Sequence, residues 1–595
     1  MFLRGAVDEL RSRRPGMMTL ISLAIVVAFG YSLAVTFGLH GMDFWWELAT
    51  LILIMLLGHW IEMSAVMGAQ DALGQLAKLL PDEAERVIGG VDGATETVPV
   101  GALSLGDLVR VRPGSSVPVD GEIVDGRSDL DESLLTGESK PVSRTVGEQV
   151  IAGSISGTGS LVVRVTKLGG DTALAGIMRL VSDAQASKSG TQVLADRAAA
   201  WLFYVALAAA SLTLVVWAIL RPGDPSFVLE RVVTVLVIAC PHALGLAIPL
   251  VAQISTAIGA RNGLLIRDRH AMEDARLIDV VLFDKTGTLT EGRQGVVAVV
   301  TADGQPENAV LSLAASVEAP AEHPIARAIV TEAKTRRVAL VRADEFEALG
   351  GRGATAVIDD VSVTVGAPRL LAERGLAPSD RLAEAAREAA GRAQTVVYVI
   401  HGSEVIGFIS LADVVRAESA EAVRLLHDRG VRVAMLTGDS REVGEAVARQ
   451  LGIDEVFAEV LPGDKAATVA QLQKDGSRVA MVGDGVNDAP ALAQADVGIA
   501  IGAGTDVAIE SAGIVLASSD PRGVAKVITL SAATYRKMLQ NLAWATGYNV
   551  VALPLAAGVA TGIGILVSPA FGAVLMSVST IVVALNAQLL RRIRI

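Results

Sequence analysis

The chain has 595 residues, 51% of them hydrophobic, and a mean hydropathy of +0.49. This length exceeds the roughly 100–200 residues of one domain, and the composition is unusual for a soluble protein, so we expect several domains and a membrane part. The net charge of −13 gives no indication of nucleic-acid binding, and the single cysteine excludes an internal disulfide.

Blocks without Asp, Glu, Lys or Arg indicate the membrane part. A spanning helix needs about 20 mainly apolar residues. The last such block, 538–590, is long enough to turn back on itself near Gly562, Gly564 and Pro569. The second block, 48–61, reaches spanning length only when its flanking residues are included. We therefore predict six spans in three hairpins, from the blocks 15–42, 48–61, 198–220, 232–260 and 538–590.

Arginine placement predicts the orientation. Both ends of the chain are rich in arginine, whereas the short connections GLHGMDF and RPGDPSFVLE contain one arginine between them. Because positively charged loops stay in the cytoplasm, the termini and the large polar segments are expected inside. We expect a multi-pass protein of the cell (plasma) membrane with cytoplasmic catalytic domains.

Two soluble segments interrupt the hairpins. Residues 68–197 contain short alternating runs such as GSLVVRVTKL, which are typical of a small β domain. In residues 262–536, runs such as DVVLF and RVAMVG each end in a Gly- or Asp-rich turn before a helical pattern, as in a parallel α/β sheet. Ligands of such sheets bind at the carboxyl ends of the strands.

Polar residues gather at three of these strand ends. On position alone, Asp284 after VVLF is more often a turn cap than a nucleophile. Three strand ends with carboxylates and hydroxyls, together with a lysine, favour instead a site for Mg²⁺ and a phosphoryl group. The residues are Asp284 and Lys285 in DKTGTLT, Thr437, Gly438 and Asp439 in TGD, Asp484, Asn487 and Asp488 in GDGVND, and Lys465.

DKTGTLT, TGD and GDGVNDAP resemble the phosphorylation domain of P-type ATPases, membrane pumps that pass through an aspartyl phosphate. The resemblance implies that ATP phosphorylates Asp284, that Thr437 and Lys465 neutralise the phosphoryl group, and that Mg²⁺ is held by Asp284, the Thr286 carbonyl and Asp484, completed by Asn487 and Asp488. It implies an α-helical membrane domain, a β-rich actuator domain, an α/β HAD-like phosphorylation domain and an α+β nucleotide-binding domain. The corresponding ranges are 15–67, 198–260 and 538–590 for the membrane, 68–197 for the actuator, 275–290 with 405–536 for phosphorylation and 291–404 for the nucleotide.

Three further motifs extend the resemblance. TGES resembles the loop that these pumps swing onto the phosphoenzyme, which implies that Glu138 orients the hydrolytic water. VEAPAEHPIARAI and LGGRGATA resemble the nucleotide-domain signature of the heavy-metal class, which implies that Glu318, His323, Gly351 and Gly353 bind ATP. Ala367 departs from the pattern, because many relatives carry Asn there.

Within the fourth apolar block stand Cys240, Pro241 and His242. In a regular helix the thiol and the imidazole would point in nearly opposite directions, but a proline between them disfavours regular geometry and allows both to face one ion. The alternative is a proline kink beside a buried cysteine that packs as a small hydrophobe.

The last hairpin favours a metal site over a proline kink beside a buried cysteine. Asn541 and Tyr548 lie two helical turns apart, and Met576 lies one turn before Ser579 and Thr580. Asn549 and Ser577 stand beside them in the same two segments. Cys, His and Met form a soft, imidazole-containing ligand set that suits copper or silver. Cys-Pro-His, N-x6-YN-x4-P and MSxST resemble the CopB-type subgroup of copper-transporting ATPases, which implies export of copper or silver and usually eight spans, against the six counted here.

The resemblance also matches Met18, Glu62 and Asp196 to a relay that admits the metal from the cytoplasm, and Glu47 to an exit carboxylate. It implies ATP and Mg²⁺ as cofactors, the bilayer and a copper donor, either a chaperone or a small thiol, as partners, and a monomer. Alternatives are a pump for Zn²⁺ or another borderline metal, a membrane-tethered phosphatase, and a copper sensor or a truncated relative without transport.

Overall fold

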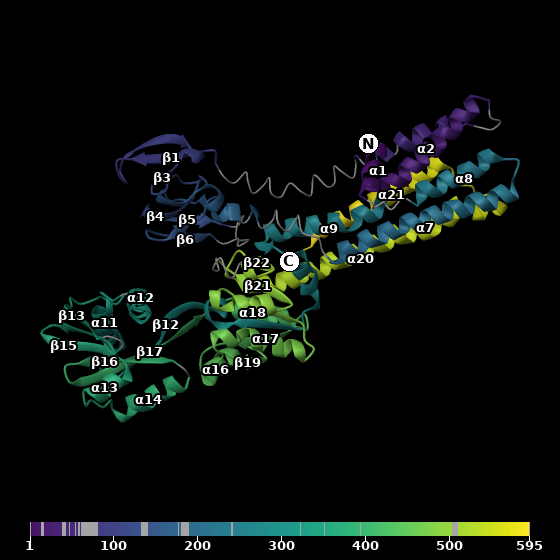
Figure 1. Ribbon diagram of the computed structural model, residues 1–595. Coiled ribbons are helices and arrows are strands. Elements are labelled where there is room, and N and C mark those ends of the chain that lie inside the picture. The colour runs from purple at the N-terminus through teal and green to yellow at the C-terminus, as the bar shows by residue number, and fades with distance from the viewer. Residues whose placement is uncertain are drawn as a thin grey trace. The chain divides into compact units, whose positions relative to one another are not determined.

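Figure 1 shows the computed structural model of the chain, which forms two compact units, Met1–Arg276 with Lys526–Ile595, and Leu277–Ala525. For residues 17, 194–196, 198–199, 242–246, 462 and 486 only the backbone is described. The structure describes residues 2–12, 17–38, 43–46, 48–53, 55–57, 60, 81–132, 141–176, 178–179, 190–239, 242–321, 323–349, 352–392, 394–502, 510–593 and 595.

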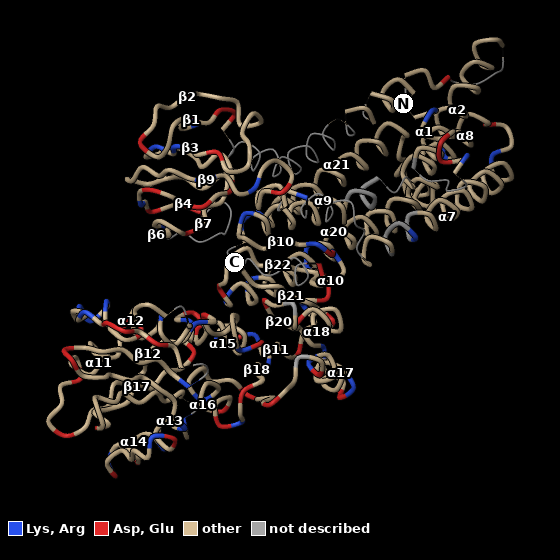
Figure 2. The backbone as a smooth tube through the Cα atoms, turned by 60° about the vertical axis from the view of Figure 1, so that its left-hand side comes forward, with Lys and Arg blue, Asp and Glu red and all other residues tan. Residues whose placement is uncertain are grey.

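The first unit holds the apolar helices. Among the described residues, Met18–Thr36, Ala200–Leu220 and Pro569–Arg592 are long and apolar enough to cross a membrane, and Leu48–Leu57 is a shorter apolar helix. Figure 2 shows how sparse charged residues are along these helices, and α21 has none. The helices are α2 (Met17–Thr36), α7 (Gly190–Leu220), α8 (Pro225–Ile238), α9 (His242–Arg261), α20 (Arg522–Ala556) and α21 (Pro569–Gln588).

These helices match the expected spans except the second, for which only the shorter helix Leu48–Leu57 is described, and two of the matched spans differ from the expectation. The fourth span consists of α8 and α9, which end and begin on either side of residues 240–241. α7 begins at Gly190, ahead of the expected residue 198, because the polar residues before the apolar run continue the helix. α8 packs against α2, α7 and α21. Gly572 permits the close approach to α21, since a Cβ there would lie 2.8 Å from the Ile238 side chain.

A short helix, α1 (Phe2–Arg11), precedes α2 and was not predicted. Its Glu9 carboxylate accepts hydrogen bonds from the backbone N–H groups of Met18, at 3.1 Å, and Thr19, at 2.9 Å. A carboxylate at a helix N-terminus satisfies unpaired donors and interacts favourably with the helix dipole. Glu9 therefore ties α1 to the start of α2.

The soluble part of this unit is an antiparallel β domain. One sheet has the order β2-β1-β3-β9-β4-β7 and a smaller one the order β6-β5-β8. Alternating Val, Ile and Leu side chains, such as Val109 and Val163, fill the interior. The strands are β1 (Glu83–Ile88), β2 (Ala94–Pro99), β3 (Leu108–Val111), β4 (Asp120–Gly126), β5 (Ser128–Asp131), β6 (Val142–Arg144), β7 (Gln149–Val150), β8 (Ile155–Ser156) and β9 (Leu161–Lys167).

The second unit contains the parallel sheet. Its strands follow the order β22-β21-β20-β11-β18-β19. The central strand β11 is buried along its whole length, as expected for a parallel strand covered on both faces. The elements are β11 (Val280–Asp284), β18 (Arg432–Leu436), β19 (Glu455–Phe457), β20 (Val479–Gly483), β21 (Val497–Ile501) and β22 (Ile514–Leu516), with α15 (Ser419–His427), α16 (Arg441–Leu451), α17 (Lys465–Lys474) and α18 (Ala489–Gln494).

An antiparallel sheet is inserted between β11 and β18, with the order β12-β17-β16-β15-β14-β13. Its two longest strands, β12 and β17, pair with each other and lead out of and back into the parallel-sheet domain. The elements are β12 (Thr290–Thr301), β13 (Asp344–Leu349), β14 (Gly353–Ile358), β15 (Val361–Gly366), β16 (Thr395–His401) and β17 (Glu404–Val415), with α11 (Glu307–Glu318), α12 (Pro324–Thr335), α13 (Pro368–Glu373) and α14 (Asp380–Gly391).

Candidate functional site

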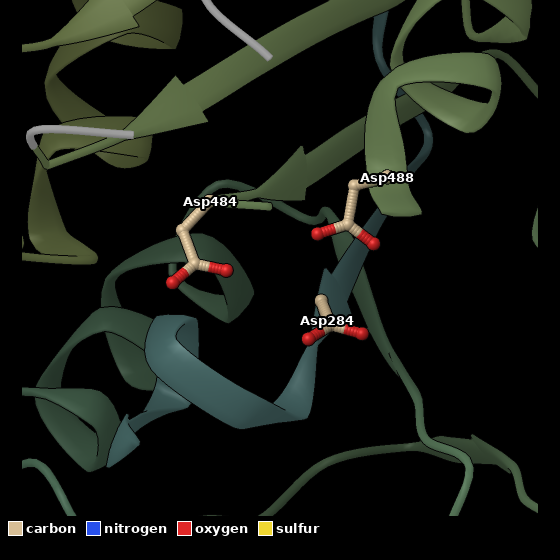
Figure 3. A group of neighbouring side chains, drawn as sticks. All are labelled: Asp284, Asp484 and Asp488. Carbon is tan, nitrogen blue, oxygen red and sulfur yellow. The ribbon is translucent and has the colours of Figure 1, made fainter. Parts of the chain in front are cut away.

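Three carboxylates meet at the carboxyl edge of the parallel sheet (Figure 3). Asp284 ends β11, while Asp484 and Asp488 follow the neighbouring strand β20. Each offers one carboxylate oxygen, and these three atoms lie within 4.8 Å of one another. Parallel pairing brings the strand ends to the same edge, so residues about 200 positions apart form one cluster.

Lys465 lies between two of these carboxylates. Its Nζ is 2.6 Å from Asp284 Oδ1 and 2.6 Å from Asp488 Oδ1. Burial lowers the pKa of Lys465, but the two carboxylates outweigh this effect and hold the pKa above its ordinary value. Lys465 therefore carries a fixed positive charge at the edge of the sheet.

The carboxylates are poorly solvated and repel one another. Burial, followed by the charge of Asp488, raises the pKa of Asp284 to about 7, although Lys465 opposes this increase. Burial and the charge of Asp488 likewise raise the pKa of Asp484. One lysine does not balance three carboxylates, so the site favours an additional cation.

Lys285 points toward a second pair of carboxylates. Its Nζ is 3.1 Å from Asp413 Oδ2 and 2.8 Å from Asp439 Oδ2. The Thr290 hydroxyl donates to the same Asp413 oxygen, at 2.7 Å. Asp413, at the end of β17, was not predicted, although its place in GFISLAD directly after the insertion was a usable signal.

The turn after Asp284 is shaped for a close approach. Gly287 has a φ of +78°, and a Cβ there would lie 1.9 Å from Asp484 Oδ2. Arg416 fixes the turn, because its Nη2 donates to the Gly287 carbonyl at 3.0 Å and its Nε to the Thr288 carbonyl at 3.1 Å. Arg416 was also missed, since nothing in its local sequence marks it.

The remaining strand-end residues differ in exposure. Thr437 is buried, and its hydroxyl accepts a hydrogen bond from the Asp439 N–H at 3.1 Å, across the turn through Gly438. Thr286 and Asn487 are exposed. The structure thus unites Asp284, Asp484, Asp488 and Lys465 in one contact network, and Lys285 with Asp439 in another.

In the inserted domain, Glu318 is the buried acid. It lies at the end of α11 with 7% of its surface exposed, and burial raises its pKa to about 7. His323 is exposed and caps α12. Gly353 has a φ of +149°, and a Cβ there would lie 2.1 Å from the Val365 carbonyl oxygen. Ala367 precedes α13, while Gly351 lies outside the described residues.

The cargo residues predicted in the last hairpin lie on α20 and α21. Asn541, Asn549, Met576 and Thr580 are buried. Asn549 Oδ1 and Ser577 Oγ are buried oxygens without a hydrogen-bond partner among the described residues. A buried oxygen of this kind usually accepts a hydrogen bond from water or coordinates an ion. Tyr548 is partly buried on α20.

Several predicted site residues lie outside the part of the chain that the structure describes. Cys240 and Pro241 are outside the described residues, and of His242 only the backbone is described, as the first residue of α9. Glu138, Glu47 and Glu62 are also outside them, as is the side chain of Asp196. Met18 is partly buried at the start of α2 and packs against Gly5.

A buried arginine in α8 also escaped prediction. Arg231 is 1% exposed, donates from Nη1 to the Val567 carbonyl at 2.6 Å, and pairs with Glu230 Oε1 at 2.5 Å. It directly precedes the apolar block 232–260, which was defined by its lack of charged residues.

Comparison with known proteins agrees with these features. The model of the P-type ATPase actuator domain matches residues 78–182, and that of haloacid dehalogenase-like hydrolases matches residues 278–496. The chain is 54% identical to the copper-exporting P-type ATPase B of Archaeoglobus fulgidus, over 99% of this chain and 84% of that protein. It is 45% identical to the protein of the same name from Enterococcus hirae, over 99% and 79%.

Among solved structures, a zinc-transporting PIB-type ATPase in the E2.Pi state is similar, with a TM-score of 0.65 and 33% identity over 99% of this chain and 92% of that one. The predicted fold class is confirmed by the two domain models and by this structure. Together with the apolar helices, these relatives show that the chain is a membrane protein with cytoplasmic catalytic domains. The chain belongs to the heavy-metal-transporting P-type ATPases, in the group of the proteins named P-type ATPase B.

Proposed function

We propose that this protein exports copper from the cytoplasm across the plasma membrane, driven by ATP, through phosphorylation of Asp284. The observation that carries this proposal is the cluster of Asp284, Asp484, Asp488 and Lys465 at the edge of the parallel sheet. The relatives named copper-exporting P-type ATPase B support the cargo. Silver, with similar ligand preferences, is the expected second substrate.

In the first chemical step, an Asp284 carboxylate oxygen attacks the γ-phosphorus of ATP, and the bond from that phosphorus to the ADP oxygen breaks. Lys465 and Thr437 would stabilise the charge that develops on the phosphoryl oxygens, as preorganised donors do in such reactions. Lys285 would hold Asp439 and Asp413 in place around the phosphoryl group.

The same residues fit Mg²⁺. Hard carboxylate and carbonyl oxygens are the ligands that Mg²⁺ prefers, and the cluster lacks one cation for charge balance. Asp284, Asp484 and the Thr286 carbonyl would hold the ion, with Asn487 and Asp488 beside it. When bound, Mg²⁺ would neutralise negative charge on the transferred phosphoryl group.

In the second step, water attacks the phosphorus of the aspartyl phosphate and releases inorganic phosphate and the free Asp284 carboxylate. Glu138 would accept the proton from that water. Glu318, His323, Gly351 and Gly353 would hold the nucleotide. Buried Glu318, protonated near neutral pH, suits contact with a neutral base better than with a phosphate.

For the cargo we propose Cys240 and His242, opposite Met576, Tyr548, Asn549 and the hydroxyls of Ser577 and Thr580. The buried oxygens of Asn549 and Ser577 support this assignment, because each lacks a hydrogen-bond partner in the described structure. Met18, Glu62 and Asp196 would admit the metal and Glu47 would release it. A cytoplasmic chaperone or small thiol would deliver copper to the monomeric pump.

The test is formation of an acid-stable phosphoenzyme from ATP with copper, silver or zinc as the only transition metal. We expect copper and silver to support phosphorylation, and we expect Asp284→Asn and Cys240→Ala to abolish it. Zinc is the alternative cargo, favoured by the similarity to a zinc-transporting structure. Phosphorylation that responds to zinc alone would replace copper by zinc, and phosphorylation indifferent to metals would refute transport.

A further inference from the structure

The amide of Asn541 is engaged at both ends. Its Nδ2 donates to the Ala247 carbonyl of α9 at 3.1 Å, and its Oδ1 accepts from Asn586 Nδ2 of α21 at 2.8 Å. Asn541 is fully buried. A side chain with both amide groups hydrogen-bonded inside the helices is better suited to brace them than to bind an ion directly.

The chain of hydrogen bonds continues outward to a charge. Lys537, one helical turn before Asn541 on α20, donates from Nζ to Asn586 Oδ1 at 2.8 Å. A charged donor polarises the amide that accepts from it, which strengthens the next hydrogen bond along the chain. Lys537, Asn586 and Asn541 therefore form a directional relay from α20 through α21 to the backbone of α9.

The inner end of the relay meets α9 where that helix is weakened. Pro249 lies inside α9 and lacks the N–H that a regular helix would donate to the Gly245 carbonyl. Pro241 directly precedes this helix in the sequence. Asn541 contributes a donor from another helix to the Ala247 carbonyl, between these two prolines in the sequence, so it restrains the first turns of α9, the helix that begins at His242.

We propose that Lys537 and Asn586 are positioning residues for the metal site, acting through Asn541 on α9. This inference rests on the proposed function and adds to it two residues outside the predicted ligand set. Lys537 does not touch the cargo, and its effect is on the affinity of the site. Because the lost hydrogen bond has a charged donor, we expect its removal to weaken the affinity of the site for the metal by about tenfold.

The outer end of the relay can be reached chemically. Lys537 and Asn586 line a groove of about 970 Å³ between α20 and α21, together with Gln540, Trp544 and other residues of the two helices. A groove of this size accommodates small molecules. An alkylammonium ion supplied in solution can therefore take the place of a truncated lysine side chain.

The experiment measures the copper concentration for half-maximal phosphorylation from ATP in the full-length protein. We expect Lys537→Ala to raise this concentration about tenfold, Lys537→Arg to restore it, and ethylammonium to lower it in Lys537→Ala but not in the wild type. Copper-independent phosphorylation by inorganic phosphate should stay unchanged in all of them. Lys526→Ala, in the first turns of the same helix, is the matched control and should behave as wild type.

A second variant tests the inner bond without removing the lysine. Asn586→Asp keeps an acceptor for Lys537 but removes the donor to Asn541 Oδ1, so we expect the same tenfold increase and no rescue by ethylammonium. The inference is refuted if Lys537→Ala and Asn586→Asp respond to copper as the wild type does, or if phosphorylation by inorganic phosphate falls in parallel. If the wild type itself ignores copper, the proposed function fails and this inference fails with it.

Discussion

Because folding raises the pKa of Asp284, we predict that the stability of the phosphorylation domain depends on pH. The ordinary pKa of an aspartate, 3.8, rises to about 7 in the folded protein. A group whose pKa is raised on folding favours the folded state at low pH, and this contribution is lost as pH rises through the folded pKa. A difference of about three pKa units corresponds to about 4 kcal/mol above pH 7, of which about 3 kcal/mol is lost between pH 5 and pH 8.

Asp284→Asn removes this penalty, since an amide does not ionise. Without Mg²⁺, the variant should stabilise the phosphorylation domain by at most about 4 kcal/mol at pH 8 and by less than half of that at pH 5. Active sites commonly hold such unfavourable charges in exchange for function.

Hydrogen exchange of the β20 amides in the intact protein measures the effect, with variant and wild type compared at the same pH. Exchange should be slower in the variant by up to about a thousandfold at pH 8 and about tenfold at pH 5. Adding Mg²⁺ should reduce the difference, because the ion compensates the wild-type carboxylate. Asp475→Asn, at an exposed position, is the control. A difference that is absent at pH 8, or equal at the two pH values, would refute the reasoning.

Three further predictions concern the cytoplasmic domains. Lys465→Met should slow phosphorylation from ATP by about 10²–10³-fold in single-turnover measurements, as does removal of a donor that stabilises developing charge, and a rate near wild type would contradict its role. Gly287→Ala should abolish phosphorylation, because its Cβ would collide with Asp484, whereas Gly304→Ala, also at positive φ but with open space around it, should cost only about 1 kcal/mol of stability and leave phosphorylation intact. As Glu318 ionises between pH 6 and pH 8, the dissociation constant of the wild type for ATP should rise about tenfold. The Glu318→Gln variant should bind ATP equally well at both pH values. Parallel pH profiles of ATP affinity in the two proteins would refute this.

The parallel sheet and its acidic edge could be predicted because their signals are local. β11 and β20 are uninterrupted apolar runs that end in Asp- and Gly-rich turns, and parallel strands bring such ends together. Lys465 was recognised from its motif. Its contact with both Asp284 and Asp488 depends on the packing of α17 against the sheet, which no local pattern specifies.

The residues that were missed act over long sequence distances. Asp413 and Arg416 reach the site because β17 returns from the inserted domain beside β12, and this antiparallel pairing across more than 100 residues leaves no local pattern at Arg416. Lys537 and Asn586 meet only when the last hairpin closes. Arg231 appeared to end an apolar block, yet the helices surround it.

ATP-driven uptake of metal into inverted membrane vesicles tests the central claim most directly, with copper, silver and zinc supplied in turn. The account predicts that copper and silver accumulate in vesicles containing the wild-type protein, and that Asp284→Asn and Cys240→Ala vesicles accumulate neither. Uptake of zinc without uptake of copper, or copper uptake that persists in Asp284→Asn, would contradict it.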